Sequence, residues 1–195
     1  MDLKPTRIFP LGEAAVTVEF GSEMSPLLNE AAIAVADHFT ANPFDGFVEA
    51  VPAIASATVF YRPSLIDRRR SPHATAFDIV AALVLRAVDS IPIGARGDER
   101  LITVPVSFAR KDALDIAAME EHTGLAADAI IDIFLAGSYR VYMLGFLPGF
   151  PYLGTVDERI AMPRHASPRM SVPKGSVGIA GRQTGIYPSD SPGGW

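Results

Sequence analysis

Residues 141 to 154 read VYMLGFLPGFPYLG, and at this stretch the pattern of the chain changes. Tyr139 to Phe146 is predicted to be a β-strand because apolar and aromatic residues dominate it. From Pro148 onward, glycine and proline recur every few residues, with only short β-type runs such as Ser176 to Ala180 between them. Glycine permits sharp bends and proline interrupts sheet ladders. This part of the chain is therefore expected to be a small β-barrel with many tight turns.

Upstream of this stretch, the pattern predicts one further strand and two helices. The strand is expected over Leu101 to Phe108, and the helices over Asp112 to His122 and Ala126 to Ala136. Gly124 follows the first helix at the position where a left-handed residue commonly ends one. These elements are assigned to the same domain as the barrel, residues 95–195.

The N-terminal part carries a different pattern, in which strands and long helices alternate. Strand periodicity appears in three runs and helical periodicity in two, the first helix starting at Ser25 and Pro26. The predicted elements are strand Ala14 to Phe20, helix Pro26 to Phe39, strands Val48 to Ile54 and Ala57 to Tyr61, and helix Thr75 to Val88. One sheet face covered by two helices makes an α+β layer domain, assigned to residues 1–94.

Composition excludes several classes of function. Acidic residues outnumber Lys plus Arg by five, so no basic surface is expected to bind nucleic acid or an anionic membrane. The chain has no cysteine, which excludes a disulfide framework and a cysteine nucleophile. The N-terminus lacks the apolar core of a signal peptide. A cytoplasmic protein without a membrane anchor is expected.

The standard catalytic and nucleotide-binding motifs are absent from the sequence. Lys174-Gly175-Ser176 has the wrong order for a phosphate loop, and no G-x-S-x-G elbow occurs. Gly175, Gly178 and Gly181 form G-x-x-G-x-x-G without a following helix pattern, which excludes a dinucleotide fingerprint. The four histidines lack metal-ligand spacing, so no metal site is predicted.

The aromatic and proline side chains of residues 145–154 have two interpretations. Phe146, Phe150 and Tyr152, with Pro148 between them, either close the end of the barrel or form an apolar wall for a ligand. Composition alone does not separate a packing role from a binding role.

Polar candidates lie further along the chain. Arg164 and Arg169 stand five residues apart in a proline-stiffened stretch, where a fixed guanidinium binds a carboxylate or phosphate with two hydrogen bonds. Gln183, Thr184 and Tyr187 offer amide and hydroxyl groups suited to a neutral amide. The alternatives are a surface or bracing role for the arginines and turn hydrogen bonding for the other three.

Four blocks of sequence carry a family resemblance. They are VYMLGFLPGFPYLG at 141–154, P-R-x-x-x-P-R at 163–169, VPKGSVGIAG at 172–181 and QTGIYPSDSPGGW at 183–195. In order and spacing these blocks resemble the allophanate hydrolase subunit 1 family, of the carboxyltransferase subdomain C/D type, which includes the B subunit of 5-oxoprolinase and the kinase inhibitor KipI. A looser resemblance extends upstream over nearly the whole chain.

The resemblance implies a fold and an activity. It implies a small N-terminal α+β domain joined to a cyclophilin-like barrel, in agreement with the split above. It also implies a complex with two partners, a KipA-like C subunit (allophanate hydrolase subunit 2 type) plus a LamB/YcsF-like A subunit, that uses ATP to open 5-oxoproline to glutamate. No ATP motif is visible in this chain, so its site is not assigned. No nucleophile or general base stands out, and the catalytic residues are not assigned.

The chain departs from the family pattern in three places. Ala109 to Leu114 lacks the usual glycine-rich turn, and His165 stands where a second arginine is common. Family members usually continue past the G-G-W with further strands, whereas this chain stops at Trp195. Either the barrel closes differently or the chain is trimmed.

The first hypothesis is a 5-oxoprolinase subunit that binds the small amide at the mouth of the barrel. Its substrate-binding residues are predicted to be Phe146, Pro148, Phe150, Tyr152, Arg164, Arg169, Gln183, Thr184 and Tyr187. The second hypothesis is a KipI-like inhibitor that docks the same aromatic patch on a sensor histidine kinase. The third is an allophanate hydrolase or urea carboxylase-type amide-processing subunit.

Overall fold

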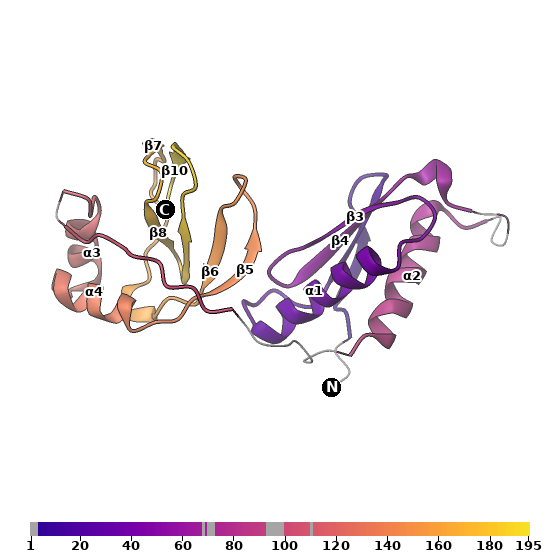
Figure 1. The fold of residues 1–195 in the computed structure, drawn as a ribbon, viewed down its shortest axis with the longest axis horizontal. Helices are drawn as coiled ribbons and strands as arrows, with labels where there is room; N and C mark the ends of the chain where they lie inside the picture. Colours follow the sequence, from indigo (N-terminus) through magenta and orange to yellow (C-terminus); the bar gives the residue numbers. More distant parts are fainter. Residues whose placement is uncertain (1–3, 68, 70–72, 93–99, 110) are drawn as a thin grey trace. The chain divides into compact units, whose positions relative to one another are not determined.

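The fold was obtained as a computed structural model, which describes residues 4–67, 69, 73–92, 100–109 and 111–195. The chain divides into two compact units, residues 1–99 and 100–195 (Figure 1). Each unit has its own strands, helices and buried core. The domain boundary predicted between residues 94 and 95 falls outside the described residues.

The first unit is built on a four-stranded antiparallel sheet of order β1-β2-β4-β3. Its strands are β1 (Arg7–Pro10), β2 (Ala15–Glu19), β3 (Phe47–Pro52) and β4 (Ser56–Tyr61). The three predicted strands are present. Sequence analysis missed β1, a four-residue edge strand that ends on a proline and is too short to show a period.

Two helices cover one face of this sheet. They are α1 (Pro26–Ala41) and α2 (Ala76–Ser90), and both were predicted. Val16 of β2 lies opposite Val59 of β4, and both side chains join the buried cluster that includes residues of α1 and α2. On the opposite side of the same strands, Thr17 and Thr58 hydrogen-bond at 2.9 Å.

The two helices begin differently. The Thr75 side chain accepts a hydrogen bond from the backbone of Asp78, whose carboxylate accepts one from the Thr75 backbone, so α2 has a capping box. Ser25 is the residue just before α1, where the sequence predicts the start of the helix, but its side chain makes no capping hydrogen bond. Pro26 opens α1, where its lack of an N–H costs nothing.

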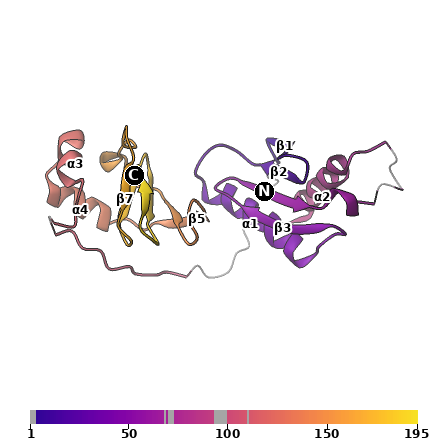
Figure 2. The ribbon, with the colours of Figure 1, turned by 90° about the horizontal axis from the view of Figure 1, so that it is seen from above.

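The second unit opens with a segment that was predicted to be a strand and is not one. Residues 101–108 pair with no other strand in the described part of the chain, and Figure 2 draws them as a plain loop. Leu101, Ile102 and Val104 are exposed. The residue types favour a strand, but a strand also needs a hydrogen-bonding neighbour, and none lies beside this segment within the described ranges.

Two short helices follow this segment, α3 (Ile116–Thr123) and α4 (Ala127–Leu135). The prediction of two helices is confirmed, but α3 begins four residues later than Asp112. Residues before it form turns instead, in which the Asp112 and Ala113 amides both donate to the Ala109 carbonyl. Gly124 ends α3 in the predicted left-handed conformation, with φ 70°.

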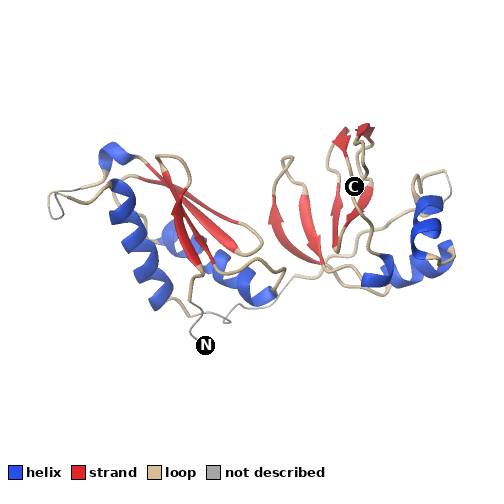
Figure 3. Ribbon diagram, turned by 180° about the vertical axis from the view of Figure 1, so that it is seen from behind, coloured by secondary structure: helices blue, strands red, loops and turns tan. Residues whose placement is uncertain are grey.

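The remaining strands form two separate antiparallel ladders. One is a four-stranded sheet of order β5-β6-β9-β8, made of β5 (Arg140–Leu144), β6 (Pro151–Gly154), β8 (Val177–Ala180) and β9 (Gln183–Ile186). The other pairs β7 (Arg169–Val172) with β10 (Ser191–Gly193). Figure 3 shows these short strands in red beside the blue pair of helices. The α+β class is confirmed, whereas the described residues do not close a barrel.

The second unit has two small buried clusters instead of one large core. Ile130 of α4 packs with Val156 and Ile160. Ile160 is the last residue of the short helix η2 (Glu158–Ile160), and Val156 lies just before this helix. Phe150 packs with Val172 and Tyr187. Across both units, no described helix has the length and apolar character needed to cross a membrane.

Candidate functional site

A groove with a volume of about 690 Å³ lies within the second unit. It is lined by residues within 104–108, 111–119, 130–134, 162–166 and 172–179, together with Arg169, Ile186, Tyr187 and Trp195. The unpaired segment 104–108 and the start of α3 contribute to this lining. The loop before β7 and the strand β8 also contribute residues. The groove thus brings together segments that are far apart in the sequence.

The charged centre of the groove is an ion pair between Arg169 and Asp115. Arg169 donates from Nη1 to Asp115 Oδ2 at 2.6 Å and from Nη2 to Oδ1 at 2.5 Å. Asp115 is the residue just before α3, and Arg169 is the first residue of β7. The pair therefore connects a helix start to a strand start across the groove.

His165 completes a three-residue cluster with this pair. Its Nε2 atom lies 3.3 Å from Asp115 Oδ2 and 3.0 Å from Arg169 Nη1. The His165 backbone amide donates to the Gly194 carbonyl, which fixes the loop that carries the ring. About a third of each of the three side chains is exposed, at 32% for Asp115, 34% for Arg169 and 35% for His165.

The cluster fixes the charge of its acid. The hydrogen bonds from Arg169 hold the pKa of the Asp115 carboxyl below its ordinary value, although partial burial acts in the opposite direction. The same pairing raises the pKa of Arg169. Asp115 is accordingly ionised near neutral pH, and the pair remains intact there.

Aromatic rings adjoin the charged cluster. The Arg164 guanidinium lies over the Trp195 ring, 5.7 Å from its centroid. Trp195 meets Phe150 and Tyr152 edge to face, both at 5.6 Å between centroids. Phe150 in turn packs on Tyr187 at 5.2 Å. These contacts support the end of the groove that Trp195 and Tyr187 line.

The structure separates the aromatic residues that the sequence grouped together. Phe150 and Tyr187 are buried, so Phe150 packs in the core, and only Tyr187 of the two also lines the groove. Phe146 is 61% exposed and Pro148 is exposed. Phe146 also adopts a left-handed backbone conformation, with φ 62°. A packing role is therefore observed for Phe150, while Phe146 stands on the surface.

The predicted residues of β9 lie apart from the groove lining. Thr184 is buried and its hydroxyl donates to the Gly178 carbonyl at 2.9 Å. Gln183 is half-buried in the sheet, opposite Ala180 of β8. Neither residue lines the groove. Of the nine predicted site residues, the groove brings together Arg164, Arg169 and Tyr187. The binding roles of all nine stay predictions.

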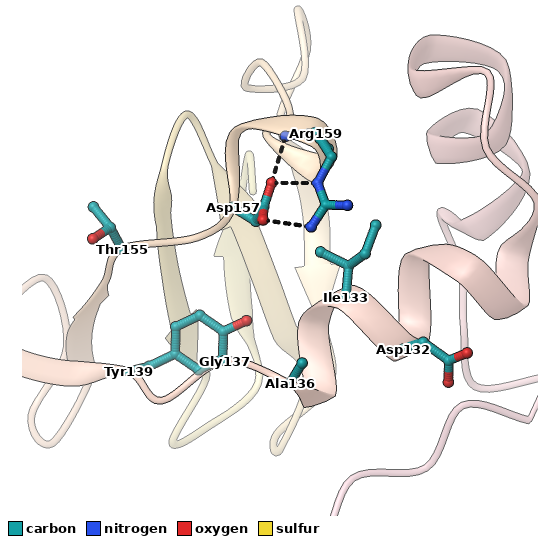
Figure 4. Close-up of a pocket in the computed structure, with 8 residues that line it drawn as sticks. All are labelled: Asp132, Ile133, Ala136, Gly137, Tyr139, Thr155, Asp157 and Arg159. Carbon is teal, nitrogen blue, oxygen red and sulfur yellow. Dashed lines mark hydrogen bonds and ion pairs between the residues drawn. The ribbon is translucent and has the colours of Figure 1, made fainter.

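A second, smaller cavity of about 430 Å³ lies beside α4 (Figure 4). Two of its charged residues pair with each other, because Arg159 donates from Nε and Nη2 to both carboxylate oxygens of Asp157, and Asp132 also lines the cavity. These bonds lower the pKa of Asp157 to about 2. Tyr139 donates its hydroxyl to the Phe134 carbonyl. The Nε and Nη2 edge of the Arg159 guanidinium is therefore already occupied.

Sequence analysis missed two residues of the groove cluster as site residues. Asp115 lies 54 positions from Arg169, and no local pattern links the two. His165 stands out in the sequence only as a departure from the family pattern, and its contact with Arg169 depends on how the loop before β7 folds. Within the described ranges, no group of three or more His, Asp or Glu residues is arranged to hold a metal ion.

Comparison with known proteins places the chain in a family. The family model described as carboxyltransferase domain, subdomain C and D, matches residues 6–195, and the chain belongs to this family. Proteins named as the B subunit of 5-oxoprolinase are similar in sequence. The one from Bacillus subtilis (strain 168) is 39% identical over 190 residues, covering 97% of this chain and 79% of that protein. The one from Escherichia coli O157:H7 is 33% identical over 193 residues, covering 99% and 83%.

Solved structures agree with this placement. A crystal structure of TTHA0988 matches with a TM-score of 0.76 and 34% identity, covering 93% of this chain and 34% of that chain. The chain thus spans about a third of the length of TTHA0988. The urea carboxylase of Kluyveromyces lactis matches with a TM-score of 0.72 at 18% identity, over 100% of this chain and 19% of that chain, and shows likeness of fold alone. The predicted family resemblance is confirmed.

Proposed function

We propose that this chain is the B subunit of a 5-oxoprolinase, which opens 5-oxo-L-proline to L-glutamate at the expense of ATP. The observation that carries the proposal is the 39% identity to the 5-oxoprolinase B subunit of Bacillus subtilis. That identity covers 97% of the chain, so it includes both units and the segments that line the groove. The substrate is a small cyclic amide that bears one carboxylate.

The groove is the proposed binding site for this amide. Arg169 holds the substrate carboxylate, and Arg164 and Tyr187 border the ring. Phe146, Pro148, Phe150 and Tyr152 support this end of the unit, and Gln183 and Thr184 are the proposed partners of the ring amide. Water adds across the ring amide, the C–N bond breaks, its carbon becomes a carboxylate and its nitrogen becomes the amine of glutamate.

ATP enters as a co-substrate of the complex, and this chain is not proposed to hold it. Lys174-Gly175-Ser176 lies in the turn between β7 and β8, and its Gly175 amide donates to the Tyr187 carbonyl. A phosphate loop instead leads into a helix whose N-terminus points at the phosphates. The residues present therefore do not fit that kind of site.

The proposal includes partners and a fold for the second unit. A KipA-like C subunit, together with a LamB/YcsF-like A subunit, completes the enzyme, and the complex acts in the cytoplasm. The C-terminal domain predicted from the sequence, residues 95–195, is proposed to belong to a cyclophilin-like barrel. Support comes from the antiparallel sheet β5-β6-β9-β8 and from the family resemblance.

The test is ATP-dependent release of glutamate from 5-oxoproline. The chain is added to, or omitted from, a mixture of the two candidate partner subunits, and glutamate is measured directly. Release only in the presence of this chain and ATP is the expected result. An inert complete mixture contradicts the proposal, as does equal release without the chain. The kinase-inhibitor and urea carboxylase-type interpretations are not favoured by the comparisons over this one.

A further inference from the structure

The guanidinium of Arg169 is bound on one edge and open on the other. Asp115 takes the outer edge, where Nη1 and Nη2 each donate one hydrogen. A guanidinium has five N–H donors in a planar fork. The Nε–H and the second Nη2 hydrogen form its side edge, and this edge has no acceptor among the residues that the structure describes. Two parallel donors therefore remain unpaired at the groove.

Two other arginines of the chain show the opposite arrangement. Arg159 donates from Nε and Nη2 to Asp157, and Arg69 donates from the same two atoms to Asp67. In both cases the acid lies two residues earlier in the chain and occupies the side edge. Arg159 thus offers a control with the same two residue types, in the same unit, but with its side edge filled.

The charge of the groove favours an anion. Its lining residues include four cationic side chains, those of Lys111, Arg164, Arg169 and Lys174, and two acidic ones, those of Asp112 and Asp115. Ser107 donates its hydroxyl to Asp112 at 2.7 Å, which occupies one of these acids. The chain as a whole carries a net charge of −5. A cationic groove on an acidic protein attracts a small anion to that place.

We propose that Asp115 and His165 position Arg169 so that its Nε and Nη2 side edge binds the carboxylate of a small carboxylic acid in the groove. Asp115 binds the outer edge of the guanidinium, and His165 lies against Nη1. Together these contacts restrict rotation of the Arg169 guanidinium. A planar fork matches a carboxylate with two parallel hydrogen bonds. Asp115 and His165 touch Arg169 and are positioning residues. The ligand's identity as 5-oxoproline rests on the proposed function. The geometry adds which edge of Arg169 binds the carboxylate and which residues position that edge.

The first experiment observes the arginine Nε–H resonances of the full chain by NMR. The probe is 5-oxoproline, and its neutral carboxamide serves as the matched ligand without a charge. The Arg169 resonance, identified by its loss in Arg169→Lys, is expected to shift with the acid and not with the amide. The Arg159 resonance is expected to stay in place with both. An Arg169 resonance that ignores the acid, or that responds equally to the amide, overturns the proposal.

The second experiment compares variants by their dissociation constants for the same two ligands. Arg169→Lys keeps a charge but loses the fork, and affinity for the acid is expected to fall about 10- to 100-fold. Arg159→Lys is the matched control and is expected to bind as the parent does. Asp115→Asn keeps the shape of the acid and removes its charge. It is expected to reduce the preference for acid over amide, whereas a purely structural role would leave that preference unchanged.

The outcome separates this proposal from the proposed function. If the complex releases glutamate but 5-oxoproline does not shift the Arg169 resonance, the proposed function is supported and this carboxylate site is contradicted. If 5-oxoproline shifts the Arg169 resonance but the complex releases no glutamate, the carboxylate site is supported and the 5-oxoprolinase reaction is contradicted.

Discussion

The two units of this protein bury their side chains in different ways. Among the residues that the structure describes, the first has one continuous cluster of 16 buried residues between a four-stranded sheet and two long helices. The second has two clusters of three buried residues each, and it exposes Leu101, Ile102 and Val104. A single large core stabilises a scaffold, whereas divided cores with a groove between their segments leave polar groups available to a ligand. We therefore expect the first unit to contribute most of the stability, and we propose the second as the binding unit.

The two units can be followed separately in one experiment. Trp195 is the single tryptophan of the chain and lies in the second unit, so its fluorescence reports on that unit. The long helices α1 and α2 dominate the helical circular dichroism signal, and both belong to the first unit. A change in one unit can therefore be distinguished from a change in the other.

The largest effect is expected from Phe39→Ala in the first core. Phe39 is 3% exposed and contacts Phe44 and Phe47. Removing a buried ring from such a core costs about 3–5 kcal/mol. The helical signal is expected to melt at a lower temperature, while the Trp195 transition stays in place. Equal shifts of both transitions would show that the units unfold as one.

A smaller effect is expected from Thr75→Ala, which removes the cap of α2. The Thr75 side chain accepts from the Asp78 amide at 3.1 Å, and loss of such a cap costs about 1 kcal/mol. The midpoint temperature of the helical transition is again expected to fall, while that of the tryptophan transition stays unchanged. Ser25→Ala is the matched control, because the Ser25 side chain makes no capping bond in α1. Equal losses in both variants would contradict the difference between the two caps.

The Asp115–Arg169 pair predicts an acid sensitivity of the second unit. The pKa of Asp115 is lowered in the folded state, chiefly by Arg169, so its stabilising contribution is present above the unfolded pKa of about 3.9. That contribution is lost as pH falls through the folded pKa. Asp115→Asn is expected to cost up to about 1 kcal/mol at pH 7, because the pair is partly exposed.

The measurement for this pair is the Trp195 unfolding transition between about pH 7 and pH 2. The parent chain is expected to lose more stability over this range than Asp115→Asn does. Parallel curves for the two proteins would show that the pair contributes nothing that depends on pH. Asp157, whose pKa is also lowered, is present in both proteins and cancels from the difference.

The smallest effect is expected from Arg159→Ala. Arg159 and Asp157 form an exposed ion pair within one short turn, and such pairs are screened by water and salt. Neither transition is expected to move measurably in thermal unfolding. A clear fall of the tryptophan transition would mean that the Arg159 turn supports the second unit, and would weaken its use as a control.

The first unit could be predicted from sequence almost completely. Its strands and helices are long enough to show their periods, as in the alternation of Val16 and Val18. The exception is β1, whose four residues carry too few positions for a period. Local patterns sufficed because each element of this unit packs one apolar face on one core.

The second unit could be predicted only in part. Gly124 and the two helices follow from local signals, and the turns around Gly175 follow from glycine and proline spacing. Strand pairing does not follow from residue type, which is why residues 101–108 were predicted to be a strand and are not. The groove cluster was found only in part, since Arg169 was predicted and Asp115 depends on a contact between distant segments.

Phe146 has a consequence for how this chain tolerates change. A phenylalanine at φ 62° is disfavoured by roughly 1–2 kcal/mol relative to its ordinary backbone conformation, a cost that glycine does not have. The ring offsets part of this cost by edge contacts with Phe150 and Tyr187 at 5.5 and 6.5 Å. In a saturation library at position 146, selection for folding alone would enrich glycine and asparagine. Selection for activity that returns aromatic residues instead would show that this surface ring is retained for what it contacts outside the chain.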